Sequence, residues 1–294
     1  MPQQNISKPP GGENPDSRNL AVITGATSGI GKAYAEYFAS QHYDLLITGR
    51  RKEVILPFAR DLNARYGIQV EAVIADLSIR EDIAKLISSL SRYNNVGALI
   101  NNAGYGLDCR FSSDDLQHQM AMVKVHVNIP LMLIHKVIPD MIARKSGIII
   151  NVSSLSAFVP TAGNAMYTGT KSFLVKFSES LHMDLSHYGI KVQCLCPGFT
   201  HTDFHRSHSL LKTINGKHAH MHSGLIPWMK PEEVVKYSIN CLSKAQVVCV
   251  PGFLNKVIRL LSSSVPKPLY YMVADRITRD VTPRQLYKWS VPSS

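Results

Sequence analysis

The sequence predicts an α/β fold in which a doubly wound parallel sheet forms a single domain. Short apolar runs alternate along the chain with longer segments of helical periodicity, as in successive βαβ units. The runs are continuously apolar, which is typical of parallel strands that helices cover on both faces. A length of 294 residues and a hydrophobic fraction of 45% suit one large domain with a sizeable core.

Seven runs are predicted as strands because each is short, apolar and bounded by glycine or polar residues. In the segments between them, apolar residues recur at the spacing of one helical face. The predicted strands cover 20–24, 44–48, 69–74, 97–100, 147–152, 190–195 and 247–250, and the predicted helices cover 30–41, 51–66, 79–92, 114–143, 162–187 and 231–244.

Three segments frame or interrupt the predicted domain, which we place at 19–251. Residues 1–18 are polar and are expected to form a flexible N-terminal arm without a secretory signal. Residues 203–230 are rich in His, Ser, Lys and Gly and carry no strong helix or strand pattern. No uninterrupted apolar run approaches the roughly 20 residues of a membrane-spanning helix.

Residues 252–294 form a basic C-terminal extension with seven Lys or Arg against two Asp. Five of its apolar residues are spaced for one helical face. Such a stripe can line a pocket, pack on a second subunit or lie on an anionic membrane surface. The stripe consists of Phe253, Leu254, Val257, Ile258 and Leu261.

The formal net charge of +11 raises the question of nucleic-acid binding. The basic residues are dispersed, and no helix-turn-helix or zinc-finger pattern is present, so no nucleic-acid partner is expected. Histidines alternate over 218–222, but no acidic residue or cysteine accompanies them. We therefore expect no metal site.

The turn after the first predicted strand is rich in glycine and opens a helix. Glycines let a backbone approach a pyrophosphate closely, and a helix N-terminus supplies free N–H groups and a positive dipole. The turn is therefore predicted to bind a dinucleotide. Its candidate residues are Gly25, Thr27, Ser28, Gly29, Ile30 and Gly31.

Tyr167 and Lys171 stand four residues apart, so they share one face of a predicted helix. An ammonium group beside a phenol favours the phenolate and lowers its pKa. A tyrosine with a lowered pKa can serve as a general acid or base near neutral pH.

Together these features resemble the short-chain dehydrogenase/reductase family, whose fold is Rossmann-like. Further marks of that family appear in order within residues 20–250. They are Asn101-Asn-Ala-Gly104, Asn128, Ser154 and Pro197-Gly198, followed by Thr200 and Thr202.

The resemblance implies hydride transfer between a nicotinamide cofactor and a carbonyl/alcohol pair. It also implies a lid over the substrate at about 203–230. Tyr167 would exchange a proton with the substrate oxygen, and Ser154 would donate a hydrogen bond to it. Lys171 would lower the pKa of Tyr167 and hold the nicotinamide ribose. Asn128, with Pro130 two residues on, would keep a water that passes protons toward Lys171.

The resemblance also implies a set of cofactor contacts at the ends of successive strands. Two residues after the third strand would meet the adenine, a loop after the fourth would pass its ribose, and a turn after the sixth would hold the nicotinamide end. These residues are Asp76 and Leu77, then Asn102, Ala103 and Gly104, then Pro197, Gly198, Thr200 and Thr202.

The end of the second strand bears on the choice between NAD and NADP. Gly49 stands where an enzyme that prefers NAD usually offers a carboxylate, and Arg50 and Arg51 follow it. A guanidinium matches a phosphate in charge and geometry, so Arg50 predicts NADP(H). Ser28 stands where many NADP-dependent members carry a basic residue.

The resulting prediction is an NADP(H)-dependent reductase of an apolar ketone, such as a fatty acyl or steroid-like ketone. The alternatives are an NAD-dependent secondary alcohol dehydrogenase and a non-catalytic dinucleotide-binding sensor or scaffold. We expect a cytoplasmic homodimer or homotetramer. A weak peripheral membrane contact through residues 252–294 is a further hypothesis.

Overall fold

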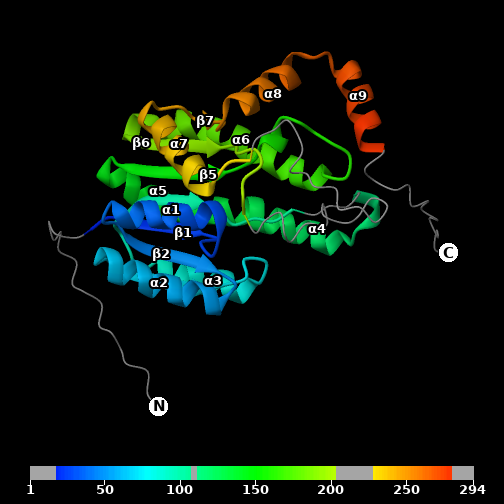
Figure 1. The fold of residues 1–294 in the computed structure, drawn as a ribbon. Coiled ribbons are helices and arrows are strands. Elements are labelled where there is room, and N and C mark those ends of the chain that lie inside the picture. Colours follow the sequence, from blue (N-terminus) through cyan, green and yellow to red (C-terminus); the bar gives the residue numbers. More distant parts are fainter. Residues whose placement is uncertain (1–17, 107–110, 203–227, 280–294) are drawn as a thin grey trace.

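A computed structural model describes residues 18–106, 111–202 and 228–279 (Figure 1). All its strands are parallel and form one seven-stranded sheet of order β3-β2-β1-β4-β5-β6-β7, so the predicted fold class is confirmed. The order reverses direction between β1 and β4, which makes the switch point of a doubly wound sheet. The strands are β1 Leu20–Thr24, β2 Asp44–Gly49, β3 Val70–Ile74, β4 Val96–Asn101, β5 Gly147–Val152, β6 Ile190–Leu195 and β7 Val248–Cys249.

Helices cover both faces of this sheet. Phe38 of α1, Ile55 of α2 and Val234 of α7 are buried in one core cluster. Ile83 of α3 and Leu133 of α5 are buried in a second cluster, to which α6 contributes as well. Each such side chain gains about 1.5–3 kcal/mol on full burial. The bounds are α1 Gly29–Ser40, α2 Lys52–Tyr66, α3 Arg80–Leu90, α5 Ile129–Arg144, α6 Ala165–Leu185 and α7 Pro231–Ser243.

The helix predicted over 114–143 is interrupted. It consists of α4 (Leu116–Val123), a π-helical turn (Lys124–Asn128) and α5, which has Pro130 in its first turn. Proline has no N–H to donate to the preceding turn, so regular α-helical bonding cannot continue through this point.

The stretch Leu116–Arg144 is long and apolar enough on average to span a membrane, with a mean hydropathy of 1.3 over its most apolar window. The same composition is found in core helices, and 44% of that window is buried. Leu133, Val137 and Met141 pack in the core cluster against the sheet, which accounts for the apolar character.

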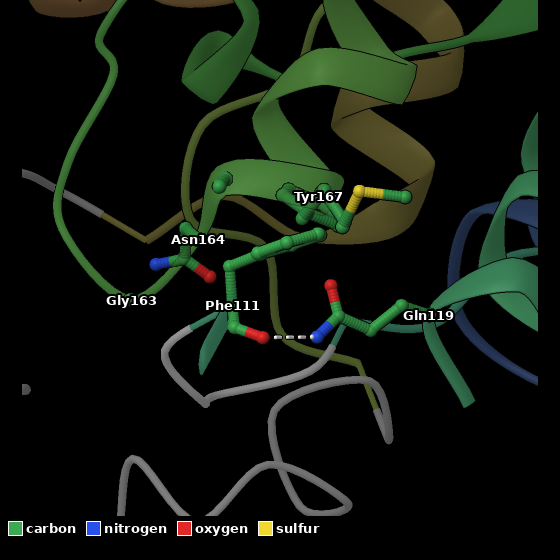
Figure 2. Close-up of a pocket in the computed structure, with 7 residues that line it drawn as sticks. Phe111, Gln119, Gly163, Asn164 and Tyr167 are labelled. Carbon is green, nitrogen blue, oxygen red and sulfur yellow. Dashed lines mark hydrogen bonds between the residues drawn. The ribbon is translucent and has the colours of Figure 1, made fainter. Parts of the chain in front are cut away.

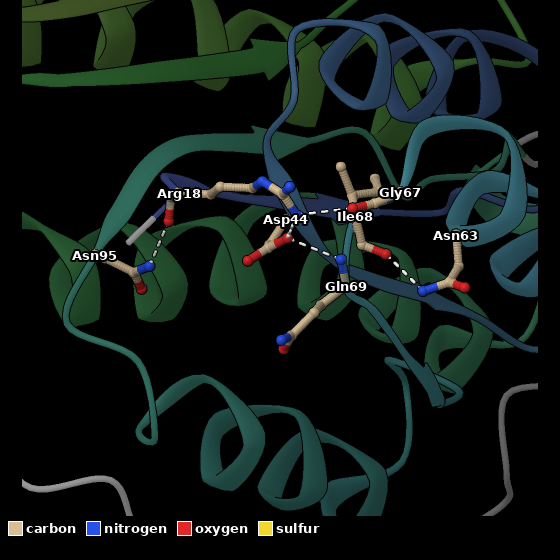
Figure 3. A network of polar contacts seen from close by, with 7 residues as sticks. All are labelled: Arg18, Asp44, Asn63, Gly67, Ile68, Gln69 and Asn95. Carbon is tan, nitrogen blue, oxygen red and sulfur yellow. Dashed lines mark hydrogen bonds and ion pairs between the residues drawn. The ribbon is translucent and has the colours of Figure 1, made fainter. Parts of the chain in front are cut away.

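A polar network ties the chain together at the amino ends of the strands (Figure 3). Arg18 donates to the Gly67 carbonyl at 2.8 Å and lies 3.8 Å from the Asp44 carboxylate. That carboxylate accepts from the Gln69 backbone N–H at 2.8 Å, and Asn95 donates to the Arg18 carbonyl. Arg18, expected in the flexible arm, is thus attached to the sheet, while residues 1–17 lie outside the described residues.

The chain continues past β7 into two helices, α8 (Phe253–Ser264) and α9 (Lys267–Arg279), which project from the sheet (Figure 1). In α8 the buried side chains are polar, namely Asn255 and Ser262, whereas Phe253 is 83% and Leu260 65% exposed. The predicted helix is present, but much of its apolar side faces outward. Most of the expected lid, 203–227, lies outside the described residues.

Candidate active site

The glycine-rich turn between β1 and α1 leaves no room for side chains. Gly25 and Gly29 have φ angles of +70° and +56°, a region that L side chains rarely adopt. A β-carbon on Gly25 would lie 2.9 Å from the Cα of Ala103, and one on Gly31 would overlap the Gly25 carbonyl. The first turn of α1 has no acidic residue, and Ser28 makes no side-chain cap. The turn therefore offers the open, positive helix terminus that a pyrophosphate requires.

The loop after β4 is fastened directly to this turn. Asn102 Nδ2 donates to the carbonyls of Thr24 and Gly25 at 2.9 and 3.0 Å. The Thr24 hydroxyl accepts from the backbone N–H groups of Asn102 and Ala103 at 3.0 and 2.9 Å. Thr24 was not predicted, although a hydroxyl ending a buried strand, next to the glycine turn, was a signal in the sequence.

The turn after β6 reaches the same place. A β-carbon on Gly29 would lie 2.5 Å from Cγ2 of Thr202, so these two residues are in contact. Thr200 is buried, and its hydroxyl donates to the Gly198 carbonyl at 3.1 Å. Pro197 accepts from the Leu155 N–H at 2.9 Å, which attaches this turn to the loop carrying Ser154.

The ends of β2 and β3 meet at an exposed ion pair. Arg50 lies 3.7 Å from Asp76, and the Arg50 side chain is 69% exposed. Partial burial acts to raise the pKa of Asp76, but hydrogen bonds from Ser78 and the charge of Arg50 outweigh it and lower that pKa. Arg51 donates to the Thr27 hydroxyl at 3.2 Å, in the glycine-rich turn.

Ser154, Tyr167 and Lys171 come together at the end of β5 and the start of α6. Ser154 follows β5 and shares a side-chain hydrogen bond with Tyr167. Lys171 lies one helical turn beyond Tyr167, with its Nζ 5.7 Å from the centre of the phenol ring. That ammonium donates to the Val152 carbonyl at 2.9 Å. The spacing predicted from the sequence thus places all three in one cluster.

The pKa values of this cluster differ from the expectation. Burial raises the pKa of Tyr167 to about 12, against a smaller lowering by the hydrogen bond to Ser154. Burial also lowers the pKa of Lys171 to about 8. The predicted depression of the Tyr167 pKa is absent because the ammonium is directed at a backbone carbonyl and the desolvation of the phenolate dominates. Near pH 7 the cluster therefore holds a neutral phenol beside a protonated amine.

Comparison with known proteins agrees with this geometry. A model of the short chain dehydrogenase family matches residues 19–210. The chain belongs to that family. The solved structure of a short-chain dehydrogenase from Sphingobium yanoikuyae in complex with NADPH superposes with a TM-score of 0.70 at 28% identity, covering 84% of this chain and 96% of that one.

Curated relatives are similar to this chain over part of their length. Human inactive hydroxysteroid dehydrogenase-like protein 1 is 33% identical over 184 residues, which is 62% of this chain and 56% of that protein. The very-long-chain 3-oxoacyl-CoA reductase of Anas platyrhynchos is 33% identical over 186 residues, 62% of this chain and 60% of that protein. The match therefore spans somewhat over half of each relative.

One predicted catalytic residue is not brought to the cluster. Asn128 is the last residue of the π-helical turn, and its side chain is exposed. His126, two residues earlier, is only 1% exposed, and its ring centre lies 5.8 Å from that of Tyr167. Residues two apart on a helix point in nearly opposite directions, so only one of the two can face α6. The role predicted for Asn128, which is to keep a water that passes protons toward Lys171, stays a prediction.

The sequence contained a signal for His126. It lies four residues after Met122 and three before Ile129, and both of these are buried. That spacing places His126 on the inward face of the helix, whereas Asn128 falls outside it. A polar residue on a buried face must be hydrogen-bonded there.

A small pocket opens beside Tyr167 (Figure 2). The start of α6 forms one wall, and Phe111 and Gln119 form the other, joined by a 3.0 Å hydrogen bond from Gln119 to the Phe111 carbonyl. Its lining mixes apolar and amide groups. The lining residues are Phe111, Gln119, Gly163, Asn164, Ala165, Met166 and Tyr167.

Proposed function

We propose that this short chain dehydrogenase uses NADP(H) to reduce an apolar ketone to a secondary alcohol. The observation that carries the proposal is the cluster of Ser154, Tyr167 and Lys171 next to the glycine-rich turn. NADPH, when bound, supplies the hydride. The residues of the chain then have to orient the carbonyl, supply a proton and exclude water.

Tyr167 is the proton donor in this proposal. Its phenol is neutral near pH 7, since burial raises its pKa to about 12. A neutral phenol can donate a hydrogen bond to the carbonyl oxygen and release its proton as negative charge develops there. Ser154, which already bonds to Tyr167, would donate a second hydrogen bond to the same oxygen and fix its position.

Lys171 supports the proton transfer through its charge. With its pKa lowered to about 8, the amine remains mostly protonated at pH 7. Its positive charge stabilises the phenolate that Tyr167 leaves behind. The same ammonium would hold the ribose hydroxyls of a bound cofactor. Its position supports this role, because a β-carbon at Gly104, in the loop predicted to pass the cofactor, would lie 3.5 Å from its Nζ.

The preference for NADP(H) over NAD(H) rests on the end of β2. A β-carbon at Gly49 would overlap Cγ2 of Thr27, so this position has no space for the carboxylate that binds an unphosphorylated ribose. Arg50 is exposed beside it and available to a phosphate. The named NADPH complex of the Sphingobium relative is consistent with the proposal.

The substrate class is proposed from the pocket and from one relative. Phe111 and Met166 give the pocket apolar walls, which favour an apolar ketone. The relative from Anas platyrhynchos is named for a very-long-chain 3-oxoacyl substrate. We therefore propose a fatty acyl or steroid-like ketone in preference to a small polar one.

A non-catalytic role is the second candidate, and the name of the human relative favours it. Such a protein would bind the dinucleotide without turnover. The presence of Ser154, Tyr167 and Lys171 in contact argues for turnover, because each has a role that cofactor binding alone does not need.

The test is a screen of ketones with NADPH and NADH, followed at the nicotinamide absorbance, with Tyr167→Phe as the matched control. Oxidation of NADPH that depends on an apolar ketone and is lost in Tyr167→Phe supports the proposal. Tight binding of NADPH without turnover on any class of ketone would support the sensor role instead.

We further propose that α8 and α9 contact an anionic membrane surface. Phe253, Leu260 and Leu261 present more than half of their surface, and Lys256 and Lys267 are exposed on the same two helices. An exposed apolar stripe with basic residues is typical of helices that lie in a membrane interface. A homodimer or homotetramer in the cytoplasm remains our expectation for the assembly.

A further inference from the structure

His126 makes two hydrogen bonds that the proposed reaction has not used. It lies in the π-helical turn between α4 and α5, and it is almost completely buried. Its Nδ1 is 3.0 Å from the Thr170 hydroxyl on α6. Its Nε2 accepts from the backbone N–H of Tyr105, also at 3.0 Å, in the loop after β4.

These partners fix the position of the proton on the ring. The Thr170 hydroxyl donates its hydrogen to the Tyr167 carbonyl at 3.0 Å, so it accepts from Nδ1–H of His126. Nε2 accepts from Tyr105 and therefore carries no hydrogen. The ring is a neutral imidazole with both nitrogens engaged. A second proton, on Nε2, would set this N–H against the backbone N–H of Tyr105.

The ring lies between the two segments that form the proposed site. Tyr105 directly follows Gly104, and a β-carbon on Gly104 would lie 2.9 Å from His126 Nε2 and 3.5 Å from Lys171 Nζ. The ring centre is 5.8 Å from the ring of Tyr105 and 5.8 Å from the ring of Tyr167. His126 thus sets how close the cofactor loop comes to the catalytic helix.

The electrostatic surroundings favour the neutral ring. Burial lowers the pKa of His126 well below its usual value, and the charge of Lys171 lowers it further. The titratable groups facing the ring are Tyr105 on the loop, and Tyr167 and Lys171 on α6. Lys124, on its own turn, is directed at a backbone carbonyl 2.9 Å away. In the described part of the chain, no carboxylate stands against the ring to stabilise an imidazolium.

We infer that His126 is a positioning residue, which holds the loop after β4 at a fixed distance from α6 and does so only as the neutral Nδ1–H tautomer. This inference deepens the proposed function, since the distance that it sets is the one between the cofactor loop and Tyr167. Because both nitrogens are occupied, His126 passes no proton to Lys171. Its contribution is to keep Tyr167 and Lys171 at a fixed distance from a cofactor bound along Gly104.

The first test needs no activity. Imidazole ¹⁵N NMR of the full chain should show one ring with a protonated Nδ1 and an unprotonated Nε2 that does not titrate near the usual histidine pKa of about 6.5. His135 is exposed on α5, and the variant His135→Gln serves as the control that identifies the signal of a histidine outside the site. A His126 signal with a proton on Nε2, or with an ordinary titration, overturns the inference whether or not the chain has reductase activity.

The second test compares His126→Gln, which can still donate and accept, with His126→Leu, which cannot. Amide exchange at Tyr105 should be slow in the wild type and faster in His126→Leu, while His126→Gln retains part of the protection. With an active substrate, His126→Leu should lower kcat roughly 10²-fold, as a misplacement of about 1 Å can. His126→Gln should recover much of this loss. Equal Tyr105 exchange in all three proteins, or full kcat in a folded His126→Leu, contradicts the positioning role.

The third readout is the dependence of stability on pH. A histidine with a lowered pKa in the folded state stabilises the protein above the unfolded value of about 6.5, and this stabilisation is lost as the pH falls below it. The folding equilibrium constant should therefore lose up to about tenfold per pH unit below that value in the wild type and in His135→Gln. This loss of stability below pH 6.5 should be missing from His126→Gln. An unchanged pH dependence in that variant would count against a neutral His126.

Discussion

Replacing Arg50 should change the cofactor preference without changing the fold. The Arg50 side chain is 69% exposed, and its pair with Asp76 is 3.7 Å long. Exposed ion pairs of this kind contribute about 0–1 kcal/mol to stability, so the melting temperature of Arg50→Ala should stay near that of the wild type. A charge-assisted contact to a 2′-phosphate is worth roughly 1.5–3 kcal/mol, or about ten- to a hundredfold in affinity.

Because the site is exposed to solvent, we expect the lower end of this range. Arg50→Ala should weaken NADPH about tenfold and leave NADH within a factor of two or three. Arg50→Asp should narrow the preference further or reverse it, since a carboxylate repels the phosphate. Arg65→Ala is the matched control, because Arg65 is an exposed arginine at the opposite end of α2 that is paired with Asp61.

The assay is a titration of nicotinamide fluorescence with both cofactors at one fixed, low ionic strength. The affinity of Arg50→Ala for NADPH should also respond less to added salt than that of the wild type. Equal dissociation constants for NADPH and NADH in the wild type would refute the reasoning. A loss of affinity in Arg50→Ala that is the same for NADPH and NADH would show that Arg50 acts on something other than the 2′-phosphate.

Three further predictions concern the site and the C-terminal helices. Tyr167→Phe should lower turnover about 10²–10⁴-fold while leaving NADPH binding nearly unchanged, as steady-state kinetics and fluorescence titration can establish together. Ketone reduction should slow as the pH rises through about 8, where Lys171 loses its proton, and a rate that is flat to pH 10 would contradict this role. The variant Lys171→Ala should weaken cofactor binding and lower the rate of reduction. The full chain should float with anionic phosphatidylserine vesicles at low salt, whereas a chain ending at Gly252 should not. If neither chain floats, the membrane contact is refuted and subunit packing is left as the role of α8 and α9.

Most of the fold could be predicted from the sequence because its strands are buried on both faces. Continuous apolar runs bounded by glycine mark such strands. The predicted bounds of the seven strands differ from the observed ones by two residues at most. The clustering of the site followed from the same topology, since the carboxyl ends of neighbouring parallel strands meet at one edge. Topology placed Ser154 at this edge, whereas Tyr167 lies on α6 and was placed beside Ser154 by the family resemblance.

The sequence was least informative where side-chain direction decides the outcome. His126 was not predicted as a site residue, although it is the buried residue of this helical turn, whereas the side chain of Asn128 is exposed. The apolar stripe of α8 left three roles open, and the sequence did not show that Asn255 and Ser262 occupy the buried side of this helix. The close packing of Asn255 on Gly198 involves residues 57 apart in sequence, so local periodicity could not reveal it.

The pKa of Tyr167 shows why a four-residue spacing does not determine chemistry by itself. Spacing places an ammonium near a phenol, but the sign of the shift depends on which effect is larger, desolvation or the charge. Here the ammonium is 5.7 Å from the ring centre and bonded to Val152, and burial prevails. A phenol that holds its proton is suited to give it to a ketone oxygen. Alcohol oxidation needs the phenolate instead, so its rate should rise with pH while reduction falls above about pH 8. Measuring both directions on one substrate pair would therefore determine whether burial or the lysine charge controls Tyr167 during turnover.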